Sequence, residues 1–146
     1  MAGLSLMASC GGPVPPPFRL NADVKQLMAA VIDPNADIVW ASVGTVDTPG
    51  FTEHIFPSNN ADWDAVKNAA WVLNESANSL MIGNRPKDTT DWMKFSQEMS
   101  ETSLRAVRAA EARDADGVFT AGGDIYQACT NCHAKYNFDL TKPKGP

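Results

Sequence analysis

Four segments of the chain carry apolar residues at alternating spacings of three and four, with helix-starting and helix-breaking residues between them. This spacing places one apolar stripe along each helix, whereas nothing in the chain shows the sustained alternation of a strand. The sequence therefore predicts four amphipathic helices. Their stripes comprise Leu20, Val24, Leu27, Met28 and Val31, then Trp63, Val66, Ala70, Leu73, Ala77 and Leu80, then Trp92, Phe95, Met99, Thr102, Ala106 and Ala109, and finally Val118, Ile125, Cys129, Cys132 and Tyr136.

Caps and breakers predict where these helices begin and end. Asn21 and Asn60 are N-caps with acidic residues in the following turn, whereas Asp33-Pro34 ends or kinks the first helix. Gly122 and Gly123 weaken the last helix and allow close approach of a neighbour. The helices are expected over 21–33, from 60 to the stop at 83, from 88–90 through 109, and, after a turn over 114–117, from 118 to 136, with a short helical turn over 36–43.

The segment from Gly44 to Asn59 is predicted to be a long loop, because it contains two prolines and two glycines. Such a loop either covers one edge of a ligand or forms a packed crossover between helices, and we favour the crossover. Four amphipathic helices with one long crossover predict an all-α fold, an antiparallel four-helix bundle. Trp63, Trp71 and Trp92 are expected in its core or in the wall of a ligand pocket.

Length and charge limit the possible functions. The chain has 146 residues, 44% of them hydrophobic, which suits one domain, expected over 20–146. No apolar run is long enough to span a bilayer. A formal charge of −5 gives nucleic-acid binding little electrostatic support. No Ser-His-Asp, paired-carboxylate or phosphate-loop pattern indicates hydrolytic or transferase chemistry, so we do not expect an enzyme.

Residues 1–19 differ in composition from the rest and are predicted to be a signal-like tail followed by a proline-rich linker. Small residues before Cys10 resemble the end of a bacterial lipoprotein signal, in which the cysteine is lipidated and anchors the protein to a membrane. The segment before Cys10 lacks a basic region, however. The alternative interpretation is a disordered tail with a free thiol.

The run Cys129-Thr130-Asn131-Cys132-His133 has the C-x-x-C-H pattern of a c-type haem attachment site. Two thiols on one side of a helical turn can form thioether bonds to the vinyl groups of one porphyrin. His133 then reaches the iron as an axial ligand. The sequence therefore predicts one covalent haem c. It also predicts a periplasmic or otherwise exported protein, because in bacteria these bonds form outside the cytoplasm.

Two other interpretations of the same run are open but less favoured. A redox C-x-x-C pair normally opens a helix after a strand, and no strand-like run precedes Cys129. A structural zinc site needs four ligands, and beyond the motif the chain offers only Cys10 and His54. Haem attachment is therefore the preferred hypothesis.

With this motif on a fourth helix near the C-terminus, residues 20–140 resemble the class II c-type cytochromes, the cytochrome c′ family. Tyr136, three residues after His133, matches a common family pattern, whereas Asn137 departs from the arginine often found next. Family members often carry an arginine one turn before the sixth-ligand position, where this chain has Val24. The resemblance makes Tyr136 and the neighbouring Lys25 candidate haem contacts.

The resemblance also makes the sixth iron ligand the functional question. In electron-transfer members a methionine of the first helix binds the iron, and Met28 stands at that position. In five-coordinate members an apolar residue leaves the site open, and Met28 would then be core packing. His54 is a less favoured ligand, and Met81, Met93 and Met99 are weaker methionine candidates.

Three functions follow from these alternatives. The preferred one is an exported monohaem carrier of the low-spin branch, with His133 and Met28 on the iron, passing single electrons between a redox protein donor and an acceptor. The second is a gas-binding protein that takes nitric oxide or carbon monoxide at an open iron. The third is the haem subunit of a larger oxidoreductase. Relatives are often homodimers through their first two helices, so the resemblance allows a dimer.

Overall fold

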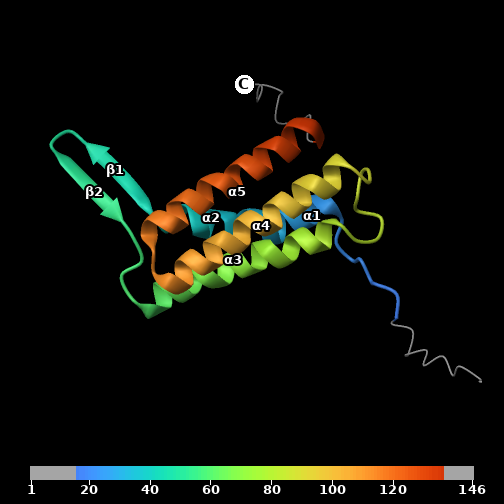
Figure 1. Cartoon of the computed structure of the whole chain (residues 1–146), viewed down its shortest axis with the longest axis horizontal. Coiled ribbons are helices and arrows are strands. Elements are labelled where there is room, and N and C mark those ends of the chain that lie inside the picture. The colour runs from blue at the N-terminus through green and yellow to red at the C-terminus, as the bar shows by residue number, and fades with distance from the viewer. Residues whose placement is uncertain (1–15, 137–146) are drawn as a thin grey trace, which may run out of the picture.

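The computed structural model describes residues 16–136, and Cys10 and Asn137 lie outside the described residues. Within that range the chain is a helical bundle with a small hairpin at one end (Figure 1). None of its helices there combines the length and the apolar character that a bilayer crossing requires. The prediction of a mostly helical fold is confirmed at this level.

The first helix is continuous from Val24 to Ala41 and consists of α1 (Val24–Leu27), a π-helical stretch η1 (Met28–Ile32) and α2 (Asp33–Ala41). Its N-cap is Asp23, two residues after the predicted Asn21. The Asp23 carboxylate accepts from Gln26 N–H at 2.7 Å, and the Gln26 side chain accepts from Asp23 N–H at 3.0 Å. This capping box satisfies two of the donors that open the helix.

Pro34 does not end the first helix, so the first of the two predicted alternatives, an end at Asp33-Pro34, is wrong, and so is a separate helical turn over 36–43. Pro34 lies in the first turn of α2, where the missing N–H is tolerated. The π turn before it carries the bond from Asp33 N–H to the Met28 carbonyl. In the same stretch, the Asn35 side chain donates to the Val31 carbonyl at 2.7 Å.

The segment predicted to be a loop contains two strands, β1 (Gly44–Thr48) and β2 (Phe51–Ile55), which form an antiparallel hairpin. Pro49 and Gly50 make the turn, and Gly50 takes a positive φ of 85°, the conformation required at the third position of a type II turn. The hairpin projects from the end of the bundle (Figure 1). It therefore neither covers the motif nor packs as a crossover.

Three long helices complete the bundle: α3 (Asn60–Leu80), α4 (Asp91–Ala112) and α5 (Ala115–Tyr136). The α3 cap is Asn59, whose side chain accepts from Asp62 N–H at 3.0 Å, rather than Asn60. In Figure 1, α3, α4 and α5 lie side by side, and the first helix packs against α3 and α5. Trp92 is buried in the core as predicted, but Trp71 is 41% exposed and lies outside it.

The first helix approaches α5 closely at Gly122. The Trp40 indole N–H donates to the Gly122 carbonyl at 2.9 Å, and a Cβ at Gly122 would lie 3.4 Å from the Trp40 ring. Nothing lies within 4 Å of a Cβ placed on Gly123. Close approach of a neighbour is thus confirmed for Gly122. The contact between Trp40 and Gly122 joins the first helix to α5, the helix that carries the C-x-x-C-H motif.

Candidate haem site

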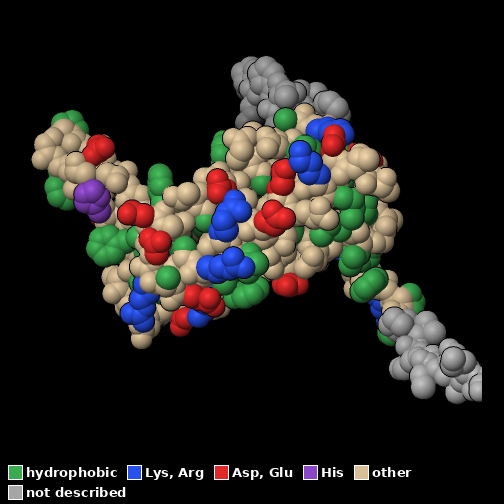
Figure 2. All heavy atoms as spheres, viewed as in Figure 1, with side chains coloured by type: hydrophobic (Ala, Val, Ile, Leu, Met, Phe, Trp, Pro, Cys, Tyr) green, Lys and Arg blue, Asp and Glu red, His purple; other side chains and the backbone are tan. Residues whose placement is uncertain are grey.

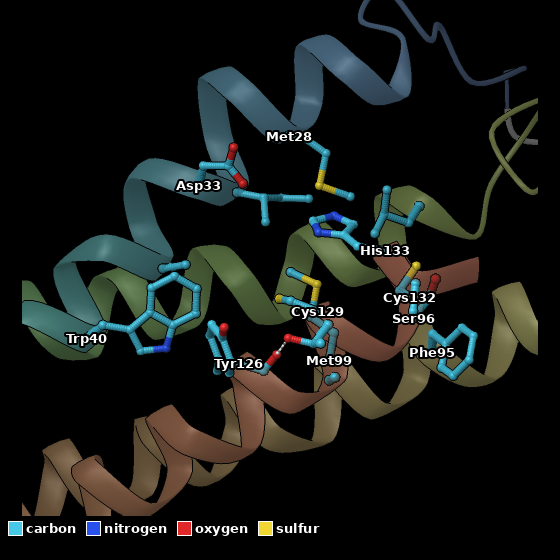
Figure 3. A pocket seen from close by; sticks show the side chains of 16 residues that line it. Met28, Asp33, Trp40, Phe95, Ser96, Met99, Tyr126, Cys129, Cys132 and His133 are labelled. Atoms are coloured by element: carbon cyan, nitrogen blue, oxygen red, sulfur yellow. Dashed lines mark hydrogen bonds between the residues drawn. The ribbon is translucent and has the colours of Figure 1, made fainter. Parts of the chain in front are cut away.

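The motif residues occupy the last turns of α5, and all three of Cys129, Cys132 and His133 are half-buried. Their inner side lines a cavity of about 370 Å³ between α5, the first helix and α4 (Figure 3). Most of its wall is apolar. Further lining residues include Met28, Ile32 and Trp40 from the first helix, Leu80 from α3, and Phe95 and Met99 from α4.

A second cavity of about 1090 Å³ adjoins the first and shares Met28, Asp33, Cys132 and His133 with it. Its remaining wall is far more polar. Lys25 and Tyr136, the candidate haem contacts, both line it. Charged residues of the wall are Asp23, Lys25, Asp33, Arg85 and Lys87.

Met28 and His133 come from opposite sides of these cavities. Figure 3 shows the Met28 thioether extending from the first helix toward the imidazole of His133 on α5. Met28 is also the first residue of the π-helical stretch, and π turns inside helices frequently occur at functional sites. A soft thioether and an imidazole are two of the axial ligands that haem iron takes in proteins. Met28 and His133 are therefore the pair in this site best suited to bind iron.

Burial disfavours the thiolate form of both thiols of the motif. Burial raises the pKa of Cys129 to about 11, and the Asp33 carboxylate adds to the rise. Burial likewise raises the pKa of Cys132 to about 11, with a smaller contribution from Cys129. Redox-active cysteines instead lie in electropositive surroundings that lower their pKa. This environment disfavours the interpretation of the motif as a redox pair.

The zinc interpretation has no support in the described part of the chain. Across residues 16–136, no three His, Cys, Asp or Glu side chains come together as a metal-binding group. Cys129, Cys132 and His133 are instead spread along one side of α5, beside an apolar cavity. Two cysteines and a histidine beside an apolar cavity would suit a haem, with Cys129 and Cys132 holding its ring and His133 available to its iron.

Tyr136 fixes the end of α5 as well as lining the larger cavity. Its hydroxyl donates to the Asp88 carboxylate, and its ring packs edge-on against Trp92 with centroids 5.1 Å apart. Lys135 next to it donates to Asp91 at 2.7 Å. The last turn after His133 is thereby tied to the start of α4. Asp88 was not anticipated from the sequence, because only the tertiary fold brings it to Tyr136.

The other candidate iron ligands differ in whether they line the two cavities. His54 lies on exposed strand β2 of the projecting hairpin, beside Thr45, and lines neither cavity (Figure 2). The structure therefore contradicts a bis-histidine site. Met81 and Met93 also line neither cavity. Met99 is buried as expected for a core residue, but it does line the smaller cavity.

The residues present fit a haem on two counts. The smaller cavity offers apolar walls for the porphyrin, and the larger one offers cations for the two propionates at its edge. Comparison of this chain with family models, with curated proteins and with solved structures finds no match.

Proposed function

We propose that this chain is an exported monohaem c-type cytochrome of the class II type, which carries single electrons between redox partner proteins. Cys129 and Cys132 would hold the haem through thioether bonds, and His133 and Met28 would bind its iron. The observation that carries the proposal is that Met28 and His133 point toward one another across an apolar cavity whose wall includes both cysteines.

Haem iron supplies a one-electron ferric–ferrous couple. The protein's part is to tune and insulate that couple. A Met28 thioether favours the ferrous state and raises the reduction potential. Ile32, Leu80 and Met99 give the cavity an apolar lining that limits access of water. If Met28 and His133 both bound the iron, its ligands would be the same in both oxidation states, which would suit fast electron transfer.

The first prediction tests the ligand pair. We expect the protein, produced with bacterial periplasmic haem-attachment machinery, to carry one covalent haem and to show six-coordinate, low-spin spectra that carbon monoxide changes little. Met28→Ala should become high-spin and bind carbon monoxide, because it loses one axial ligand. Absorption spectra of both oxidation states, with and without carbon monoxide, measure this.

Met93→Ala is the matched control, because Met93 lines neither cavity, and its spectra should equal those of the wild type. A high-spin ferric wild type would overturn the electron-carrier proposal and favour the gas-binding alternative. If Met28→Ala stayed low-spin while Met99→Ala did not, Met99 would be the ligand. Failure of the Cys129→Ser, Cys132→Ser double variant to lose the haem would refute thioether attachment.

A further inference from the structure

Arg85 is a buried cation in the connection between α3 and α4. It is only 8% exposed, and it lines the larger cavity together with Met28 and His133. Its guanidinium donates to the Ser79 carbonyl at 2.9 Å and to the Ala22 carbonyl at 2.9 and 3.3 Å. These bonds join the end of α3 to the segment that precedes the first helix.

The charge of Arg85 has no anionic partner in the described part of the chain. Among residues 16–136, no Asp or Glu forms an ion pair with it. Three of its five N–H groups are used, and all three bond to neutral carbonyl oxygens. The C-terminal dipole of α3 compensates only part of a full charge. Burying a cation without a counter-charge is costly, so the site is suited to an anion.

The other charged residues around this cavity also favour an anion. Lys25 and Lys87 lie on its wall as exposed cations, and Asp23 and Asp33 are the acidic residues there. Cations therefore outnumber carboxylates. The cavity also meets the apolar one at Met28 and His133, so an anion bound in it would be the charged edge of whatever fills the apolar part.

We propose that Arg85 binds a haem propionate and is the residue that compensates the propionate charge in this chain, with Lys25 and Lys87 at the rim. The inference rests on the proposed function, because it requires a haem at Cys129 and Cys132. It assigns a buried partner for the propionates to the α3–α4 connection, whereas the only cation that the resemblance suggested was Lys25 of the first helix.

The test compares Arg85→Gln, Arg85→Lys and the control Arg105→Gln by their midpoint reduction potentials. Arg105 pairs with Asp124 on the surface at 2.8 Å and lines neither cavity, so its loss changes net charge equally. Removing a cation near the propionates favours ferric iron. We expect Arg85→Gln to shift the reduction equilibrium about tenfold, which lowers the potential by about 59 mV. Arg85→Lys keeps the positive charge, so its reduction potential should stay close to that of the wild type.

Covalent haem content, measured by mass on the wild type and on all three variants, separates the two proposals. A wild type without haem refutes the proposed function, whereas a haem-loaded Arg85→Gln with the same potential as Arg105→Gln refutes only the role of Arg85. A purely structural Arg85 would lower the melting temperature in the Gln and Lys variants alike and leave the potential unchanged. A potential gap that appears only on adding phosphate would show a free-anion site and would also overturn the inference.

Discussion

Single side chains hold the end of α5 that carries Cys129, Cys132 and His133. Asp88 connects two helices, α4 and α5, since its carboxylate accepts from the Thr90 and Trp92 backbone N–H groups at 3.0 Å and from the Tyr136 hydroxyl. The Tyr136 bond, followed by the two backbone bonds, holds the pKa of Asp88 well below its usual range. Asp88 thus caps the start of α4 and fixes the last turn of α5 at once.

This lowered pKa predicts a pH-dependent stability. An ionised Asp88 stabilises the folded state fully at pH values above its unfolded pKa of about 3.9, and the contribution is lost as the pH falls through the lower folded pKa. Asp88→Asn should therefore lower the melting temperature at pH 7, and the difference from the wild type should shrink below about pH 4. Thermal unfolding followed by circular dichroism measures this.

Asp37→Asn is the control for Asp88, because Asp37 is exposed on α2. It should unfold like the wild type across the same pH range. If the melting temperature of Asp88→Asn stayed below that of the wild type by a constant amount down to pH 2, the substitution would have removed contacts unrelated to ionisation.

The helices were largely predictable as elements, and the errors have local causes. Periodicity and caps located α3, α4 and α5 to within a few residues, because these helices bury one continuous stripe. The first helix was placed less well. Proline normally disfavours helix in the residue before it, yet the chain stays helical through Pro34, with a π-helical stretch directly before α2. A π-helical stretch of this kind cannot be predicted from the residue types alone.

Neighbouring glycines of α5 give an element-scale prediction. Gly123→Leu should raise the free energy of unfolding by about 0.5–1 kcal/mol, because it gains helix propensity and meets nothing within 4 Å of its Cβ. Gly122→Leu should lower the free energy of unfolding by about 1–3 kcal/mol, because its Cβ would already touch the Trp40 ring at 3.4 Å and the larger side chain should displace that ring. Urea unfolding of both variants measures the pair.

If the first helix moves away from α5 in Gly122→Leu, the low-spin fraction of the haem spectrum should fall as well. Gly123→Leu should keep it. Equal stability of the two variants would show that the contact between Trp40 and Gly122 does not hold the first helix in place.

At the scale of the whole molecule, the bundle and the hairpin are separate in role. The bundle contains both cavities, whereas every residue of β2 is exposed and the hairpin extends away from them (Figures 1 and 2). The hairpin was missed because a strand with no buried side shows no apolar alternation. The Pro49-Gly50 pair was the available signal for a hairpin turn, but the same pair also marks turns in loops.

We therefore expect the hairpin to be dispensable for the haem site. Replacing residues 45–55 with a short Gly-Ser linker should leave the haem content and low-spin spectrum unchanged, because surface loops tolerate such changes. Absorption spectra and circular dichroism of the shortened chain measure this. A change to high-spin iron would instead place a ligand, such as His54, on the hairpin.

The amino-acid sequence by itself determined the helical class and the C-x-x-C-H motif, because helix periodicity and the spacing of two thiols and an imidazole are local properties of the chain. It also pointed to Met28, but only through a resemblance. The tertiary structure decided that Met28 and His133 line common cavities, that His54 lies away from them, and that Arg85 is buried at their polar edge. These facts depend on contacts between residues far apart in the chain, which packing of the helices alone brings together.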